Sequence, residues 1–235
     1  MRRTLTVTLD TIRQEIVSCA RCKRLREYCT RIAREKKGPY RDDTYWAKPV
    51  PGFGDPQARV LVIALAPAAH GANRTGRVFT GDVAGGSGDF LMRAMHGAGF
   101  ANMPTSRHAN DGLELWDAYI MSAVRCAPPD NKPTPAEIIA CQSHLAAEAA
   151  ALPRVKVIVA LGRIGFDATW RLLAGRGVVI KPRPPFRHGA VYRVPAAPDV
   201  VASYHPSRQN TNTGVLTAPM LASVFLTARQ LAAAV

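Results

Sequence analysis

The chain has 235 residues, of which 47% are hydrophobic, and this size allows one substantial α/β core without requiring a second domain. Lys and Arg outnumber Asp and Glu by 31 to 17, so the formal charge is +14 and a polyanion is the first partner to expect. No stretch approaches the ~20 apolar residues of a membrane span and no apolar leader opens the sequence, which argues against a membrane partner and predicts a cytoplasmic protein.

The N-terminal part is helical by its pattern. Residues 9–35 are predicted to form one helix, because apolar residues such as Ile12 and Ile16 recur at helical spacing. A Cys-Ala-Arg-Cys segment, 19–22, lies near the middle of this predicted helix. A polar, proline-bearing stretch over 36–56 then leads to the core.

The rest of the chain alternates strands and helices. Residues 59–66 form a nearly continuous apolar run of strand length, the pattern of a parallel strand covered on both faces. Three further strands are predicted at 117–124, 155–161 and 200–204. Helical periodicity fills the connections and the C-terminal end: 90–98, 138–152, 164–174 and 219–234. The segment 134–137, Thr-Pro-Ala-Glu, supplies a capping threonine, a proline at the first helical position and an acid for the helix over 138–152. Residues 178–194, which alternate apolar residues with prolines, are predicted to form a peripheral hairpin.

This order of elements predicts a single domain over 1–235. We expect an α/β fold of three layers, α/β/α, around a central four-stranded parallel twisted sheet. Ligands of such folds bind outside the carboxyl ends of the strands. The loops after the first, second and fourth predicted strands are therefore where functional residues are sought.

The five cysteines suggest a metal site. Cys19 and Cys22 form a Cys-x2-Cys pair, and Cys126 and Cys141 follow the second strand and lie in the next helix. In a reducing compartment four such thiols favour metal ligation over disulfides. The spacing alone leaves zinc and an iron–sulfur cluster open. Cys29 is the spare, predicted to be a half-buried helix thiol.

Three motifs in order resemble one family. The loop 65–82, Leu-Ala-Pro-Ala-Ala-His-Gly-Ala-Asn-Arg-Thr-Gly-Arg-Val-Phe-Thr-Gly-Asp, is similar to the first motif of the family 5 uracil-DNA glycosylases, and 205–210, His-Pro-Ser-Arg-Gln-Asn, to their second. The segment 125–135, which opens Arg-Cys-Ala-Pro-Pro-Asp-Asn, resembles the cysteine-bearing segment of that family, and 45–55 its lead-in. Family 4 enzymes share this pattern but carry an acid where Leu65 stands here.

The resemblance implies an activity and a cofactor. The implied activity is base excision repair, in which a DNA glycosylase flips out uracil and releases it hydrolytically, leaving an abasic site. The implied cofactor is a [4Fe–4S] cluster, held by Cys19, Cys22, Cys126 and Cys141, that ties segment 9–35 to the core. The expected partner is DNA that contains uracil or other damaged bases, bound by a monomer associated with the nucleoid in a prokaryote.

Cleavage of an N-glycosidic bond leaves positive charge on the sugar and negative charge on the departing base. His205, after the fourth strand, is the expected donor to the uracil anion, with a purely structural histidine as the alternative. Asp82 is the expected acid that orients water, because the residues directly after the first strand carry no polar side chain. The alternatives for Asp82 are a helix cap or an ion pair with Arg74 or Arg77, and Asp89 is its nearest rival.

The base and the DNA need further contacts. Phe79 is expected to stack on the base and Asn131 to bind its polar edge, while the alternatives are a plain core residue and a turn residue. Ser122 stands where family 4 members carry asparagine, so we expect weak discrimination and release of other deaminated bases. The small residues Ala66 and Ala68 allow the backbone to approach the substrate. The expected contacts with DNA come from five residues: Ser207, Arg208, Gln209, Arg74 and Arg77.

Two other functions fit part of the pattern. One is a non-catalytic nucleic-acid-binding module in which the four cysteines hold zinc. The other is a nucleotide-processing α/β hydrolase that acts on small substrates, against which the net charge argues.

Overall fold

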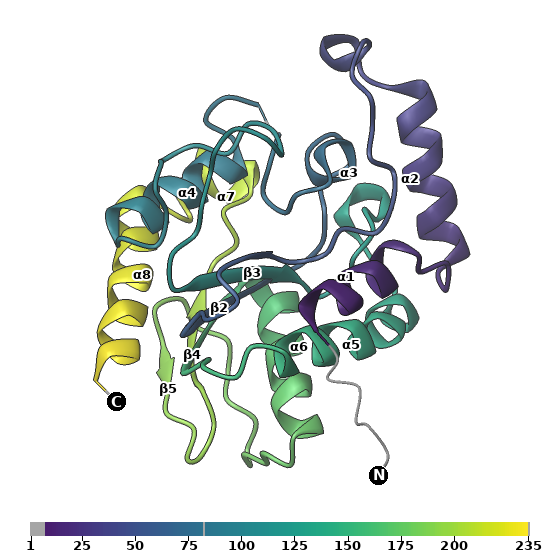
Figure 1. The fold of residues 1–235 in the computed structure, drawn as a ribbon. Coiled ribbons are helices and arrows are strands. Elements are labelled where there is room, and N and C mark those ends of the chain that lie inside the picture. Colours follow the sequence, from purple (N-terminus) through teal and green to yellow (C-terminus); the bar gives the residue numbers. More distant parts are fainter. Residues whose placement is uncertain (1–7, 82, 235) are drawn as a thin grey trace.

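The computed structural model describes residues 8–81 and 83–234, and it shows a sheet covered by helices on both faces (Figure 1). The sheet has six strands in the order β1-β3-β2-β4-β6-β5. Their bounds are β1 Phe53–Gly54, β2 Val60–Ala64, β3 Ala118–Ser122, β4 Val157–Leu161, β5 Val191–Tyr192 and β6 Asp199–Ser203. The helices are α1 Leu9–Val17, α2 Lys23–Glu35, α3 Ala72–Thr75, α4 Ser87–Gly97, α5 Pro135–Ala150, α6 Gly162–Gly175, α7 Arg208–Asn212 and α8 Ala218–Ala233, with short 3-10 turns at Gly38–Tyr40 and Pro129–Asn131.

The four central strands confirm the predicted parallel sheet. β3, β2, β4 and β6 pair in parallel, and every residue of β2, β3 and β4 is buried. Alternate residues enter different cores: Val60 and Val62 of β2 pack with α4 and α8, whereas Leu61 and Ile63 pack with α5 and α6. Continuous apolar runs are therefore needed, because both faces of the sheet are covered by helices.

Two edge strands were not predicted. β1 pairs antiparallel with β3, and β5 pairs antiparallel with β6. The prediction of a hairpin over 178–194 is wrong, because only Val191–Tyr192 of that segment is a strand and its partner is β6. Proline cannot donate to a strand ladder, and Pro182, Pro184 and Pro185 fill the part where the first arm of the hairpin was expected.

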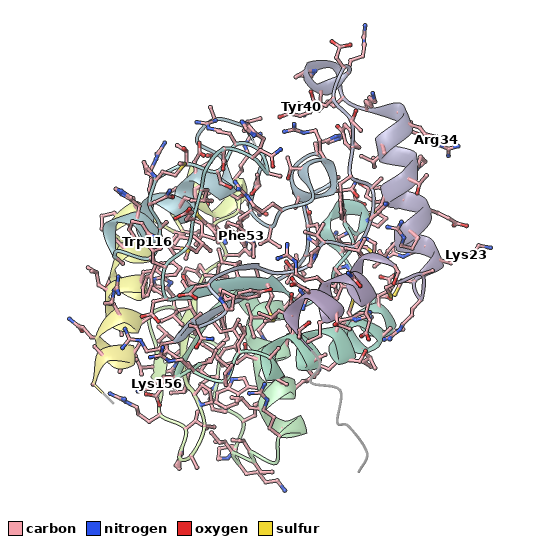
Figure 2. All side chains as sticks on the ribbon, viewed as in Figure 1. Lys23, Arg34, Tyr40, Phe53, Trp116 and Lys156 are labelled. Atoms are coloured by element: carbon pink, nitrogen blue, oxygen red, sulfur yellow. The ribbon has the colours of Figure 1, made fainter. Side chains whose placement is uncertain are left out.

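The single helix predicted over 9–35 is also wrong. α1 ends at Val17 and α2 begins at Lys23, so Cys19 lies in the break and Cys22 at the start of α2. α1 buries Ile12 and Ile16 and packs on α5, whereas α2 buries Leu25 and Cys29 beside Cys126 and Cys141. One straight helix could not bury both pairs, and the break lets α2 turn away along the side of the molecule (Figure 1). Figure 2 shows Lys23 and Arg34 pointing outward from α2.

None of the helices within the described ranges is long and apolar enough to cross a membrane.

A buried ion pair joins the sheet to α5. Arg125 and Glu148 are 1% and 0% exposed, with 2.7 Å between Arg125 Nη1 and Glu148 Oε2. Glu148 Oε1 also accepts hydrogen bonds from the Tyr119 hydroxyl, at 2.9 Å, and from the Gly52 amide, at 2.8 Å. Burial, reinforced by the charge of Glu148, raises the pKa of Tyr119, so the phenol stays protonated and donates. The pair fixes the orientation of the chain just before Cys126.

Glu148→Ala is expected to destabilise the fold by about 3–5 kcal/mol, because it leaves the Arg125 charge buried and unpaired. The free energy of unfolding in urea measures this effect. Glu27→Ala, which removes the exposed pair between Lys23 and Glu27 on α2, is the matched control and should change that free energy by less than about 1 kcal/mol. Equal effects of the two substitutions would contradict the structural role given to the buried pair.

Candidate active site

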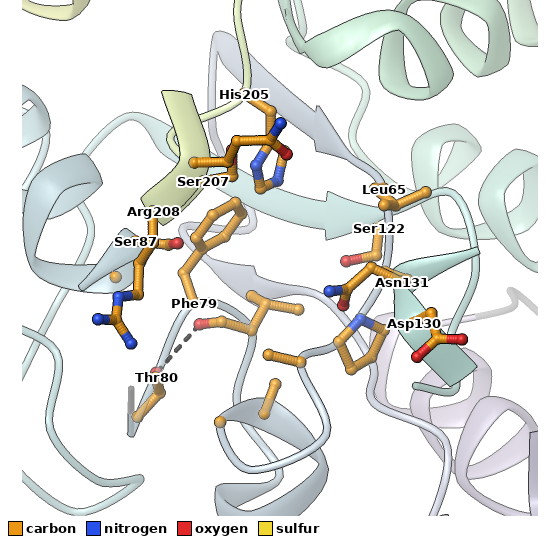
Figure 3. Close-up of a pocket in the computed structure, with 18 residues that line it drawn as sticks. Leu65, Phe79, Thr80, Ser87, Ser122, Asp130, Asn131, His205, Ser207 and Arg208 are labelled. Atoms are coloured by element: carbon orange, nitrogen blue, oxygen red, sulfur yellow. Dashed lines mark hydrogen bonds between the residues drawn. The ribbon is translucent and has the colours of Figure 1, made fainter. Parts of the chain in front are cut away.

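A cavity of about 460 Å³ opens at the carboxyl ends of the parallel strands (Figure 3), and we call it the active-site pocket. Leu65 enters it just after β2, Ser122 at the end of β3 and His205 just after β6. Because parallel strands end at the same edge of a sheet, loops far apart in the sequence meet there. The volume lies in the range of small-molecule sites in proteins.

The structure brings together most of the residues predicted for the site. Eight of them line the active-site pocket: Ala66, Ala68, Phe79, Asn131, His205, Ser207, Arg208 and Gln209. They come from the loop after β2, the turn at Pro129–Asn131 and the segment from β6 to α7. These are the three segments in which the sequence motifs lie.

His205 is held in place by two hydrogen bonds to its backbone carbonyl and by close packing against a glycine. Its carbonyl accepts from Asn210 Nδ2 and from the Ser207 amide, each at 2.8 Å. Gly162, in the turn between β4 and α6, has a φ of +76°, and a Cβ added to it would lie 3.0 Å from the His205 Cβ. The turn therefore needs glycine at this position, both for its backbone conformation and for the close approach to His205. Burial lowers the pKa of His205 from 6.5 to about 4, so the imidazole is neutral near pH 7 and can donate one N–H.

Phe79 lies against His205 in the wall of the active-site pocket. The two rings are stacked, with 5.8 Å between centroids and 27° between planes. The φ of Phe79 is +50°, a conformation that bulky residues rarely adopt and that often marks a functional site. Gly88 supports this conformation, because a Cβ there would lie 2.3 Å from the Phe79 carbonyl oxygen. Phe79 also packs on the core, so the predicted stacking role and the core alternative apply to the same side chain.

The turn at Pro129–Asn131 carries the amide of the pocket. Asp130 and Asn131 both have positive φ, 53° and 57°, after two prolines. The Asn131 amide and the Ser122 hydroxyl are directed into the cavity in Figure 3. The sequence interpretation missed Asp130 as a pocket residue, although the Pro-Pro-Asp-Asn turn was a signal that could have found it. In Figure 3 its carboxylate points away from Phe79 and His205.

Two predicted DNA contacts lie elsewhere. Arg77 is 6% exposed and forms an ion pair with Asp111, at 2.8 Å, while its Nε donates to Thr80 Oγ1 at 2.8 Å. Arg74 pairs with Asp43 and donates to the carbonyls of His70 and Gly81. The structure therefore uses both arginines to hold the loop after β2, and their expected contacts with phosphates find no support in it.

The two candidate acids, Asp82 and Asp89, differ in what the structure says of them. Asp82 lies outside the described residues, although Thr80, two positions before it, lines the active-site pocket. Asp89 is buried: it accepts from the amides of Gly85, at 2.8 Å, and Ser106, at 3.2 Å, and pairs with Arg107. Asp89 thus anchors the loop ahead of α4 and is not among the residues that line the active-site pocket.

The four predicted metal-ligating cysteines come from three places: the break between α1 and α2, the chain after β3 and the middle of α5. The Arg125 amide donates to Cys141 Sγ at 3.4 Å, a bond that also suits a thiolate. Burial raises the pKa of Cys22 to about 11, and the charges of Cys141, Cys126, Glu137 and Cys19 add to this effect. Within the described ranges, no three His, Cys, Asp or Glu side chains lie close enough together to hold a single metal ion.

Cys29 differs from its prediction. It is fully buried, not half-buried, and its thiol donates to the Ala127 carbonyl at 3.7 Å. It packs with Cys126 and Cys141 in the small apolar cluster that also holds Leu25. Cys126 and Cys141 are thus buried in an apolar cluster against which Cys22 packs, and this surround suits a cofactor held by sulfur ligands.

Comparisons with known proteins place the chain in a family. Residues 51–227 match the model of the uracil DNA glycosylase superfamily. A type-5 uracil-DNA glycosylase of Thermus thermophilus is 49% identical over 219 residues, covering 93% of this chain and 96% of the relative. Others from Mycobacterium leprae and Pyrobaculum aerophilum are each 43% identical, covering 96% and 92% of this chain and 96% and 90% of their own lengths. The chain therefore belongs to the uracil-DNA glycosylase superfamily and, within it, to the type-5 enzymes.

Proposed function

We propose that this protein is a monofunctional DNA glycosylase that hydrolyses the N-glycosidic bond of uracil in DNA. The observation that carries the proposal is the His205 imidazole stacked on Phe79 in a pocket where three strand ends meet. Burial lowers the pKa of this imidazole to about 4, which keeps it neutral near pH 7. The pocket has an apolar wall and a few hydrogen-bonding groups, which a flipped pyrimidine requires. The type-5 relatives are named for the same activity.

The base is held before it is released. Phe79 supplies the flat apolar surface and Asn131 the amide for the polar edge of uracil. As the bond breaks, electrons move to the base, and the neutral His205 N–H donates to the developing charge at O2. Because the neutral imidazole donates a hydrogen bond and keeps its proton, uracil leaves as an anion.

The sugar and the water need a carboxylate. Leu65, Ala66 and Ala68 line the active-site pocket directly after β2, and none of their side chains can orient water. Asp82 remains our proposed acid: its negative charge would stabilise the cationic sugar and its oxygen would accept a proton from the attacking water. Asp130 is the internal comparison, since it lines the same pocket with its carboxylate turned away from the two rings.

The rim of the pocket meets DNA. Arg208 and Gln209 are exposed at the start of α7, and Ser207 Oγ caps that helix by accepting from the Asn210 amide at 3.3 Å. These residues would contact the backbone and fill the space that the flipped base leaves in the duplex. Such contacts weaken steeply with added salt.

Cys19, Cys22, Cys126 and Cys141 would hold the [4Fe–4S] cluster. When bound, the cluster supplies a rigid link between the N-terminal helices and the core, since hydrolysis transfers no electron. The residues of this chain fit such a group through four thiols from three elements, an apolar surround and the Arg125 amide aimed at Cys141.

The function is tested with three substrates: a duplex with one uracil, the same duplex with thymine, and free deoxyuridine. We expect release of uracil from the first alone. Cleavage of deoxyuridine in preference to the duplex would favour a small-substrate hydrolase. Binding without any release from a metal-loaded preparation would favour a non-catalytic module.

The pocket is expected to accept other damaged bases. Among the described lining residues, Asn131 and Gln209 are the side-chain amides, and Ser122 is too short to reach as an asparagine would. With so few polar contacts, discrimination between bases should be weak. Release of hypoxanthine and ethenocytosine from duplexes, measured under conditions where uracil is fully excised, is the expected result. No detectable release of either base would refute this expectation.

A further inference from the structure

A second hollow lies beside the active-site pocket. It has a volume of about 720 Å³ and is lined by parts of α1, the break before α2, the segment 46–51 and the end of α3. Three cations line it: Arg13, Arg26 and Lys48. We call it the basic hollow. None of its described lining residues is Asp or Glu.

Its cations lack acidic partners. Arg26 is half-buried, whereas Arg13 and Lys48 are exposed at the edge of the hollow. The half-buried Arg59 and Arg74, by contrast, are paired with Asp117 and Asp43. Across 8–81 and 83–234, Arg13, Arg26 and Lys48 form no ion pair, and Arg26 Nη1 is buried without a hydrogen-bond partner. Positive charges gathered in a hollow repel one another and raise the local concentration of anions.

The side chains that line the basic hollow suit a phosphate better than a base. Trp46 could stack on a base, but its ring packs on Gly76, where a Cβ would lie 2.9 Å from Trp46 Cδ2. Its Nε1 donates to the Pro49 carbonyl at 3.2 Å, and Lys48 Nζ lies 5.5 Å from the ring centroid. The charged groups that remain are donors only, and phosphate oxygens accept only.

The position of the hollow follows from α3. Gly71 and Ala72 line the active-site pocket, whereas Thr75 and Gly76 line the basic hollow. A four-residue helix rises by about 6 Å along its axis, and successive phosphates of one strand are ~3.4 Å apart along a duplex. The hollow therefore lies within a few nucleotides of a base held in the active-site pocket.

We propose that the basic hollow binds backbone phosphates of the DNA strand that flanks the extruded nucleotide. The inference rests on the proposed function, because that function places DNA at the neighbouring pocket. Arg13 and Lys48 are the residues to test. Arg26 is left unchanged because its charge lowers the pKa of the Cys126 thiol and it lines the hollow together with Cys19, so its replacement would disturb the cysteine site.

The test compares wild type with the double variant Arg13→Ala/Lys48→Ala. Binding to a uracil-free duplex is measured by fluorescence anisotropy between 50 and 200 mM salt. Removing one phosphate-binding cation should lower the slope of log Kobs against log salt by about 1, so we expect the double variant to lower it by about 2. Arg13→Lys/Lys48→Arg, which keeps both charges, should keep most of the slope.

The matched control removes two exposed arginines from the opposite edge of the sheet, Arg154→Ala/Arg176→Ala. It changes the net charge equally and should leave the slope unchanged. Equal decreases of the slope in the two double variants, or an unchanged slope in the first, would overturn the proposal. Normal uracil release with an unchanged slope refutes the basic hollow alone, and a changed slope without uracil release refutes the proposed function alone.

Discussion

His205→Ala should lower the single-turnover rate of uracil release by about 10²–10³-fold, because it removes the donor aimed at the negative charge of the departing base. The rate is measured with enzyme in excess over a labelled uracil duplex. Affinity for the duplex should change little, since His205 lies inside the active-site pocket and Arg208 lies at its rim. Asp82→Ala is expected to lower the single-turnover rate by a similar factor. Asp130→Ala, which removes the other carboxylate near the active-site pocket, is the control and should keep the wild-type rate. If His205→Ala and Asp82→Ala both keep the wild-type rate, the proposed site is wrong.

The state of His205 also fixes a pH dependence. A free histidine gains its charge near pH 6.5, but burial lowers the pKa of His205 to about 4. The imidazole thus stays neutral as the pH falls from 8 to 5, and His205 should contribute no inflection near 6.5 to the single-turnover rate. A wild-type profile that loses activity with a midpoint near 6.5, and that becomes flat in His205→Ala, would contradict the neutral donor.

The same shift affects stability. Between pH 6.5 and about 4 the unfolded chain protonates this histidine and the folded chain does not. The unfolded state therefore binds more protons in that window, and stability falls as the pH is lowered through it. The urea midpoint of wild type should decrease from pH 6.5 toward 4 more than that of His205→Ala.

The four central strands and the site motifs were predictable from the sequence for one reason. Residues buried on both faces of a sheet must be apolar without interruption, and the stretches 60–64 and 157–161 have that pattern. The loops that follow them had to meet at one edge, so His205 and Phe79 could be placed together before their contact was known.

The missed features depend on contacts between distant segments. The helical period runs through 19–22, and only the separate burial of Ile16 against α5 and Leu25 against the cysteine cluster breaks the helix. The burial of Arg77 depends on Asp111, 34 residues away in sequence. β1 has two residues, too few for any periodicity. Local pattern cannot reveal any of these.

The second large effect concerns the cysteines. Cys22→Ala, Cys126→Ala and Cys141→Ala should each abolish the brown colour and iron content of an anaerobic preparation, because each removes one proposed cluster ligand. Cys29→Ala should keep both. The four variants share a side chain and an apolar surround, so ligation is what separates them. A colourless wild type with one zinc per chain, or equal iron loss in Cys29→Ala, would contradict the assignment.

The same variants should release α2 from the core. α2 has 13 residues and two buried side chains, Leu25 and Cys29. Burial of a leucine contributes about 1.5–3 kcal/mol, whereas fixing one residue of backbone costs about 1–2 kcal/mol, so apolar contact alone holds this helix weakly. Ligation through Cys22 at its first turn would supply the missing restraint. Limited proteolysis should therefore cut within 23–35 much faster in Cys22→Ala than in wild type or Cys29→Ala, while the core from β2 onward stays resistant. Equal protection of α2 in all three proteins would show that the helix is held without the cluster, and the structural role proposed for it would fail.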